Sequence, residues 1–321
     1  MSKSNTKLAR VLALVLALVL IAAACGDDDD SDTSSDGDDG GDAAAGALGE
    51  LDLSGIDITV GSKDFTEQLV LGEMLVQAYE AAGASVGNQV DLGGTVVNRE
   101  ALLAGEIDVY AEYNGTGWTV HLEEDYETVK CEGCSTVDPA TLTEAVAEAD
   151  LERNGIRWLG RSPFNDTYGF ASSPDLTDEG QPFTMQSMAD YLAATPDATV
   201  CMESEFPVRP DGLVLFEEGT GYEIPEGQIE ILDTGIIYTE TESGNCDFGE
   251  VFTTDGRIDG LGLNLVDDPG MMILYNVSVT MPDELYQQSP DAFGEIAELL
   301  FAGLDNPTMT ELNRLVDIEG Q

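Results

Sequence analysis

Few side chains in this sequence have the types and spacing that catalysis needs. His121 is the only histidine, and it follows an apolar run, which favours a structural role over proton transfer. The sequence contains no nucleophile elbow (GxSxG), no P-loop and no HExxH motif. Its 63 Asp and Glu residues bring carboxylates together by chance, so paired acids are not informative. These residues therefore do not predict an enzyme.

Lys63 is the basic residue whose position most suggests ligand binding. It lies in the segment GSKDFTE (residues 61–67), after a predicted strand and before a predicted helix. In open α/β sheets, ligands bind outside the carboxyl ends of the strands, where a lysine can pair with an anionic group. The alternative is a solvated surface lysine, and position alone leaves both open.

The cysteines predict disulfides rather than a metal or redox centre. Cys131 and Cys134 form a CxxC motif, whereas Cys201 and Cys246 are isolated. Four of the five cysteines follow residue 25, and an even number of cysteines in the mature part of an exported chain favours the pairs Cys131–Cys134 and Cys201–Cys246. A four-thiolate zinc site is the alternative. A thioredoxin-like site does not fit, because this CxxC lies in a polar, loop-like stretch. We therefore predict no metal and no cofactor.

The composition excludes two classes of protein. With 12 Lys and Arg against 63 Asp and Glu, the net charge is −51, which argues against binding nucleic acid. No apolar run reaches the roughly 18–20 residues of a membrane span, so an integral membrane transporter is excluded. Hydrophobic residues make up 42% of the chain, which is enough for a folded core.

The N-terminal 50 residues predict export and a tether. Residues 1–25 have a basic start and an apolar stretch, and small residues precede Cys25, similar to a bacterial lipobox. Cys25 would then carry acyl chains and anchor the protein at a membrane surface; the alternative is an ordinary secretory signal. Residues 26–50 are too acidic and polar to fold, which predicts a disordered linker. The calcium alternative at residues 36–40 lacks EF-hand spacing.

From residue 51 onward, predicted strands and helices alternate. The strands are expected at 56–60, 90–92, 107–110 and 156–159, and the helices at 64–82, 98–104 and 139–154. Asp64 and Glu67 have the spacing of a capping box. This βαβαβ rhythm predicts a mainly parallel sheet with helices on both faces. A similar rhythm resumes at 185–251, and 282–316 is mostly helical, so two α/β lobes are expected.

A series of motifs, in a fixed order, gives a more specific indication. They are GSKDFTE (61–67), GGT (93–95), LAGEIDVYAEYNGTG (103–117), NDTYG (165–169), SEFPVRPDG (204–212) and TTDGRI (253–258). Together they resemble the osmoprotectant-binding proteins, the glycine betaine/carnitine/choline substrate-binding subunits of ABC importers. The resemblance covers residues 56–316. It implies an α/β fold of the two-lobed type II periplasmic-binding-protein class, with a ligand cleft between the lobes.

The resemblance also implies a binding site in which aromatic rings hold a quaternary ammonium group. By motif position, the rings are Tyr113, Tyr168, Phe252 and Tyr275, and Thr116 is the threonine of the motif that contains Tyr113. The polar residues near a ligand carboxylate are Lys63, Asp166 and Arg209. Phe252 stands where the family usually has tyrosine. A trimethylammonium group has no N–H donor, so ring quadrupoles have to hold it, at roughly 0.5–2 kcal/mol per ring. A lysine or arginine supplies a charge-assisted contact to a carboxylate.

The resemblance implies a lipid-anchored, monomeric, solute-binding subunit on the extracytoplasmic face of the cell membrane. Its expected partners are a quaternary amine, the permease subunits of an ABC importer and the membrane, through the anchor. Lobe I is expected at residues 51–162 and 258–321, and lobe II at 163–257. The alternatives are the same fold binding another small solute, such as an amino acid, and an exported enzyme or surface adhesion protein.

Overall fold

The computed structural model describes residues 46, 48–131, 136–176 and 182–320. The predicted signal peptide, Cys25 and most of the predicted linker lie outside these residues. Within the described ranges, no helix is both long enough and apolar enough to cross a membrane. The same part of the chain has no group of three or more His, Cys, Asp or Glu side chains suited to a metal ion.

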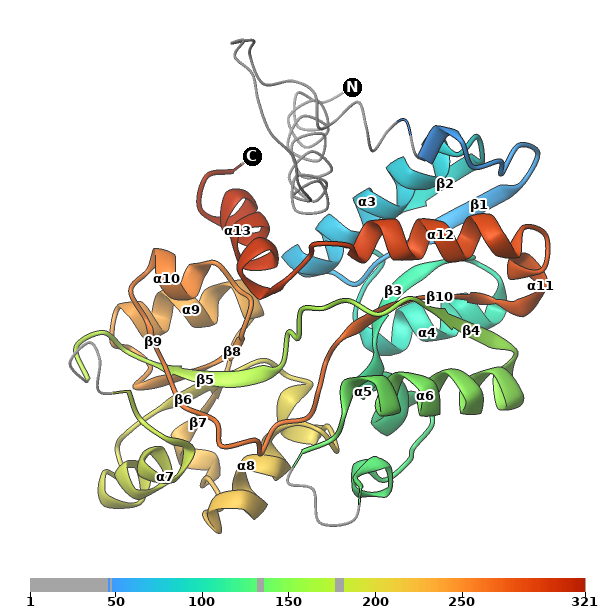
Figure 1. Ribbon diagram of the computed structural model, residues 1–321. Helices are drawn as coiled ribbons and strands as arrows, with labels where there is room; N and C mark the ends of the chain where they lie inside the picture. Colours follow the sequence, from blue (N-terminus) through green and yellow to red (C-terminus); the bar gives the residue numbers. More distant parts are fainter. Residues whose placement is uncertain (1–45, 47, 132–135, 177–181, 321) are drawn as a thin grey trace, which may run out of the picture.

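The first lobe contains strands from both ends of the described chain (Figure 1). Its strands are β1 (Asp57–Gly61), β2 (Ser85–Gln89), β3 (Tyr110–Tyr113), β4 (Ile156–Leu159) and β10 (Val277–Pro282). β1 is parallel to β2, and a parallel bridge from Val60 to Val109 joins β1 to the segment before β3. β10 lies between β3 and β4 and is antiparallel to both. The sheet is therefore mixed rather than mainly parallel, because β10 enters it from the second lobe.

Helices cover the first lobe, and their ends follow from local sequence. They are α3 (Thr66–Ala81), α4 (Thr95–Ala104), α5 (Asn114–Thr116), η1 (Gly117–His121), η2 (Tyr126–Val129), α6 (Pro139–Asn154), α11 (Asp283–Tyr286), α12 (Pro290–Phe301) and α13 (Asn306–Asp317). α6 begins after Asp138, whose side chain accepts the N–H of Thr141, and ends at Gly155 in the left-handed conformation. The prediction of this helix at 139–154 is confirmed.

The predicted capping box at the start of α3 is wrong. The residue before the helix is Phe65, and no side chain caps this end. Glu67 is buried, with 2% of its surface exposed, and its carboxyl group accepts hydrogen bonds from Tyr113 and Thr254. Glu67 turns inward because these hydroxyl groups offer buried donors, and it is therefore not a solvent-facing cap.

The second lobe has one mixed sheet in the order β7-β6-β8-β5-β9. Its strands are β5 (Tyr168–Ser172), β6 (Val200–Met202), β7 (Ile229–Ile231), β8 (Phe248–Phe252) and β9 (Asn264–Leu265), and its helices are α7 (Met185–Ala194), η3 (Phe206–Val208), α8 (Leu213–Thr220), η4 (Glu226–Gln228), α9 (Thr234–Glu242) and α10 (Arg257–Gly260). β6 is parallel to β7 and β8, whereas β5 is antiparallel to β8 and β9. Buried aromatic rings on β5, η3 and α8 pack together in its core.

Two segments cross between the lobes, residues 160–167 between β4 and β5 and residues 266–276 between β9 and β10 (Figure 1). The predicted return to lobe I at residue 258 is wrong, because β9, at Asn264–Leu265, pairs with β5 of the second lobe. Beyond the crossings, α13 contacts both α3 and α10. The lobes are thus joined by two chain segments and by one helix that packs on both.

The predicted Cys201–Cys246 disulfide is confirmed. Cys201 lies on β6, Cys246 lies just before β8, and their Cα atoms are 5.8 Å apart. Both cysteines are buried. Cys131 is disulfide-bonded as well, but Cys134 lies outside the described residues, so the Cys131–Cys134 pairing stays a prediction.

Opening the Cys201–Cys246 disulfide should destabilise the second lobe. The bond closes a loop with a sequence separation of 45 residues. We expect Cys201→Ser/Cys246→Ser to lower the free energy of unfolding by roughly 3–4 kcal/mol, because the unfolded chain regains loop entropy. Urea titration of the variant and of wild-type protein measures the difference. An unchanged midpoint and slope would contradict the expected contribution.

Candidate ligand-binding site

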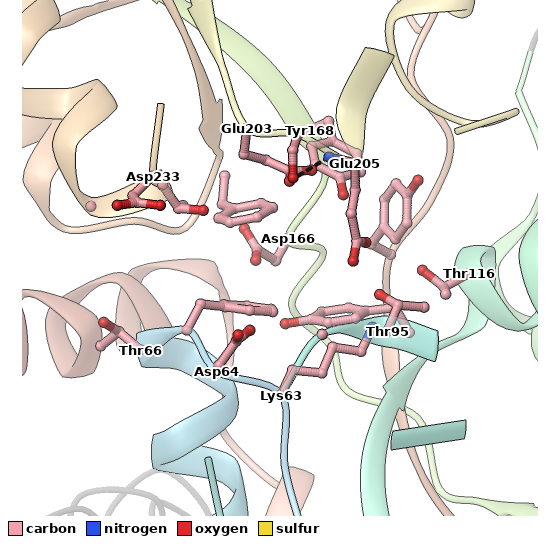
Figure 2. Close-up of a pocket in the computed structure, with 18 of the residues that line it drawn as sticks. Lys63, Asp64, Thr66, Thr95, Thr116, Asp166, Tyr168, Glu203, Glu205 and Asp233 are labelled. Carbon is pink, nitrogen blue, oxygen red and sulfur yellow. Dashed lines mark hydrogen bonds between the residues drawn. The ribbon is translucent and has the colours of Figure 1, made fainter. Parts of the chain in front are cut away.

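A cavity of about 530 Å³ lies between the two lobes. All eight side chains indicated by the sequence motifs line it: Lys63, Tyr113, Thr116, Asp166, Tyr168, Arg209, Phe252 and Tyr275. Figure 2 shows Lys63 on the first-lobe side, Tyr168 on the second-lobe side and Asp166 between them. The cavity has the size of a small-molecule site.

Five aromatic rings form a closed circuit around part of this cavity. In order they are Phe65, Tyr113, Tyr275, Tyr168 and Phe252, with neighbouring ring centroids 5.0–6.2 Å apart. Neighbouring rings are thus close enough that one small organic cation could lie within the roughly 6 Å reach of a cation–π contact with several of them.

Strand pairing and the two crossings position these rings. Tyr168 and Phe252 are directly paired residues of antiparallel β5 and β8, which brings their rings together at one end of the second sheet. Tyr113 ends β3 and pairs with Val277, the first residue of β10. Tyr275 lies two residues before Val277, in the second crossing, and its ring meets that of Tyr113 edge to face. Each lobe thus contributes to the circuit.

Phe65 is the ring that sequence reasoning missed. Its centroid lies 5.0 Å from that of Phe252 in a stacked arrangement, and it joins Phe252 of the second lobe to Tyr113 of the first. The signal was available, because Phe65 follows Lys63 by two residues in the same loop at the carboxyl end of β1. That position is where an open α/β sheet places its ligand contacts.

Lys63 is held by a buried carboxylate. Its ammonium lies 2.7 Å from Glu112, and Nζ lies 5.1 Å from the centre of the Tyr113 ring. Glu112 also contacts His121 at 2.9 Å and accepts the backbone N–H of Tyr113 at 2.7 Å. Burial alone would raise the pKa of Glu112, but Lys63 and His121 hold it below its ordinary value. His121 thus contacts the same carboxylate that pairs with Lys63.

Arg209 joins the two lobes at the polar end of the cavity. Its guanidinium donates two hydrogen bonds to Asp211 of the same lobe, both 2.8 Å long. It also donates to Thr116 at 3.2 Å and to Thr95 at 3.4 Å, both in the first lobe. Its centre lies 5.5 Å from that of the Tyr168 ring. Arg209 and Thr116, predicted separately from two motifs, therefore touch each other.

Acidic side chains outnumber basic ones in the cavity lining. The acids are Asp64, Asp166, Glu203, Glu205 and Asp233, and the bases are Lys63, Arg209 and Arg257. Each base already pairs with a carboxylate that does not itself line the cavity. These carboxylates are Glu112, Asp211 and Asp255. The cavity therefore carries an excess of negative charge, which attracts a cation.

Glu250, a buried carboxyl group near the second-lobe wall, should make the stability of the protein depend on pH. One oxygen accepts the N–H of Glu203, and the other has no hydrogen-bond partner among the described residues. Burial, with a smaller contribution from Glu203, raises the pKa of Glu250 to about 8 from an ordinary 4.5. The folded protein thus keeps a proton that the unfolded chain loses.

Stability should therefore fall as the pH rises from 4.5 to about 8, by roughly 1.4 kcal/mol per unit from this group. Glu250→Gln removes the proton uptake, so its unfolding free energy should fall less steeply than that of wild-type protein over this range. Urea titrations at four or five pH values would measure both slopes. Equal slopes would contradict this assignment.

Comparisons with known proteins identify the family. Residues 56–321 match the substrate-binding domain of the ABC-type glycine betaine transport system. The chain belongs to this family. It is 28% identical to the glycine betaine-binding protein YehZ of Escherichia coli K12, over 82% of this chain and 86% of YehZ. It is 31% identical to a glycine-betaine-binding protein of Pseudomonas aeruginosa, over 82% and 83% of the two chains.

Family membership confirms the predicted fold class and the prediction that the protein is not an enzyme. The structure of apo YehZ from Escherichia coli superimposes with a TM-score of 0.60 at 27% identity, covering 83% of this chain and 94% of the other. The fold is that of a two-lobed type II periplasmic-binding protein. The protein is accordingly a substrate-binding component of an ABC importer and acts outside the cytoplasm.

Proposed function

We propose that this protein captures a quaternary amine in the five-ring circuit and delivers it to the permease of its importer. The observation that carries this proposal is the closed circuit of Phe65, Tyr113, Tyr275, Tyr168 and Phe252 in an acidic cavity. A quaternary ammonium keeps its charge at every pH and offers no N–H to an acceptor. Aromatic faces therefore suit it better than hydrogen-bonding groups do.

The polar end of the cavity suits the other part of such a ligand. Lys63, Arg209 and Thr116 line it and present N–H and O–H donors. A carboxylate placed there would gain charge-assisted hydrogen bonds. Because Lys63 and Arg209 already have carboxylate partners, part of that charge is balanced before a ligand enters. Glycine betaine and carnitine would use this end through a carboxylate, and choline would use it through a hydroxyl group.

Capture should favour the closed arrangement of the lobes. A cation at the centre of the circuit would contact Phe65 and Tyr113 of the first lobe together with Tyr168 and Phe252 of the second. Contacts that exist only when the lobes are together shift the equilibrium toward closure. The closed, loaded protein would then dock on the permease subunits.

A ligand panel tests the proposed function. Titration calorimetry of the purified protein with glycine betaine, carnitine, choline and an amino acid such as proline should show binding of at least one quaternary amine. Affinity in the micromolar range corresponds to about −8 kcal/mol, which ring contacts and a charge-assisted contact can supply together. Binding of the amino acid with no binding of any quaternary amine would contradict the proposal.

We further propose that Cys25 is acylated and anchors the protein to the outer face of the cell membrane. The support is the apolar stretch that ends in small residues directly before Cys25. Cys25→Ser should move the protein from the membrane fraction to the soluble fraction and leave solute affinity unchanged. Wild-type protein that lacks acyl mass and fractionates with soluble proteins would contradict the anchor.

A further inference from the structure

Two carboxyl groups meet beside the ring circuit, at the boundary between the lobes. Glu67 lies in the first turn of α3, and Asp166 lies in the first crossing and lines the cavity. They are 2% and 4% exposed, and Thr254 contacts both carboxyl groups: its hydroxyl donates to Glu67 and its backbone N–H donates to Asp166. Two carboxylates buried together repel each other, which favours a form in which one of them carries a proton. In Figure 2 the Asp166 carboxyl group lies in the middle of the cavity view.

The remaining contacts of this pair come from both lobes and from α13. Glu67 accepts hydrogen bonds from Tyr113 at 2.8 Å, Thr254 at 2.6 Å and Asn313 at 3.2 Å. Asp166 accepts the backbone N–H of Thr254 at 3.0 Å. The Tyr113 hydroxyl belongs to a ring of the circuit, whereas Thr254 follows β8 of the second lobe. The pair is therefore in contact with the proposed ligand site and with the lobe boundary.

Neither carboxyl group has a cationic partner. Among the ion pairs of the described residues, none involves Glu67 or Asp166. Tyr113 on β3 and Asp255 after β8 interact with the pair, and Asp317 on α13 accepts a hydrogen bond from Thr66, the residue before Glu67. Arg257 is held by Asp255 and lies 3.6 Å from Asp317. Burial is the largest cause that raises the pKa of Glu67 and of Asp166, and for Asp166 the nearby Glu67 adds to it.

We propose that the Glu67–Asp166 pair holds a proton in the empty protein and releases it to solvent when a quaternary cation enters the ring circuit. This inference rests on the proposed function. The entering cation supplies the positive charge that the pair lacks, and it therefore favours the form in which both carboxyl groups are ionised. The ligand itself neither gains nor loses a proton, so the proton that leaves comes from the protein.

The sign of the pH dependence follows from this exchange. A cation that favours the ionised pair binds more tightly as the pH rises, until the empty protein has lost the proton by itself. One released proton gives at most a tenfold gain in affinity per pH unit. A site without this linkage would bind a permanent cation with the same affinity throughout, because the ligand does not titrate.

The test uses tetramethylammonium and choline, which carry a permanent charge and no carboxylate. Titration calorimetry of the full protein at each pH from 5 to 9, in two buffers of different ionisation enthalpy, gives the affinity and the number of protons released. We expect affinity to rise several-fold across part of this range, with a fraction of a proton released per ligand in the same window.

A flat affinity with no proton release would overturn the linkage while leaving the proposed function intact. If neither cation, glycine betaine nor carnitine binds at any pH, the proposed function fails and the inference fails with it.

Two variants identify the source of the proton. Asp166→Asn cannot ionise and should abolish both the proton release and the pH dependence. Glu250→Gln is the matched control, because Glu250 is also buried with a raised pKa, but its hydrogen-bond partner is Glu203 of the second lobe and not a member of the pair. The Glu250→Gln variant should still release protons when the ligand binds. Release that persists in Asp166→Asn, or that disappears in Glu250→Gln, would overturn the assignment. If Asp166→Asn does not fold, Glu67→Gln provides the same comparison.

Discussion

Replacing Glu112 by alanine should lower the free energy of unfolding by roughly 3–5 kcal/mol, because the change leaves a buried charge without its partner. Lys63 is 3% exposed and would lose the carboxylate that lies 2.7 Å from its ammonium. The backbone N–H of Tyr113 and the hydroxyl of Tyr110 would also lose their acceptor. Since Tyr113 and Lys63 line the cavity, ligand affinity should fall in the same variant. Urea titration and calorimetry measure the two effects.

An exposed ion pair serves as the matched control. Glu127, whose side chain is 68% exposed, pairs with Lys130. Glu127→Ala should change the unfolding free energy by less than about 1 kcal/mol, because water and salt screen this pair. If Glu112→Ala were no more destabilising than Glu127→Ala, Glu112 would not be the support of Lys63 that its geometry indicates.

Replacing Phe65 or Phe252 by leucine should weaken the binding of quaternary amines roughly 2- to 30-fold per ring, the equivalent of 0.5–2 kcal/mol. Leucine keeps most of the apolar volume but removes the aromatic face. The two phenylalanines are better suited to this change than the tyrosines, because Tyr113 also donates a hydrogen bond to Glu67. The double variant should lose both increments, and choline and glycine betaine should be affected alike. Phe252→Tyr should be tolerated, because the ring face remains.

A core phenylalanine separates the loss of a ring face from the loss of packing. Phe293 is fully buried in the first lobe, where its ring meets that of Tyr79 edge to face. Phe293→Leu should lower the melting temperature and leave the affinity close to that of wild-type protein. Leucine variants of Phe65 and Phe252 should keep a melting temperature close to that of wild-type protein and bind quaternary amines more weakly. Wild-type affinity in a well-folded Phe65→Leu/Phe252→Leu variant would contradict the role of these rings.

Motif order in the sequence indicated eight of the residues that line the cavity, because each motif lies where a strand ends or a crossing begins. Tyr113 ends β3, Tyr168 begins β5 and Phe252 ends β8. Local signals also predicted α6 well, with Asp138 and Gly155 marking its two ends. Where a residue acts through its neighbours in the sequence, as Asp138 and Gly155 do at the ends of α6, spacing alone predicts its role.

Features that depend on long-range contacts could not be predicted in this way. Glu67 has the spacing of a cap, yet its partners include Thr254 and Asn313, which are 187 and 246 residues away. The second lobe boundary was placed too early, because β9 consists of only two residues and is recognised by its pairing with β5. For Phe65 a local signal existed in its position two residues after Lys63, but its stacking on Phe252 of the other lobe is a long-range contact that the sequence does not show.

The central claim is that aromatic faces recognise a permanent positive charge. It is tested most directly by comparing choline and glycine betaine with their neutral-carbon isosteres, in which a tert-butyl group replaces the trimethylammonium group. Each pair has nearly the same shape and differs in the charge at the centre of the circuit. Calorimetry should show that the isosteres bind at least tenfold more weakly, because each ring face that the cation contacts contributes roughly 0.5–2 kcal/mol that a neutral group does not gain. Equal affinities for the charged and neutral members of a pair would contradict the cage.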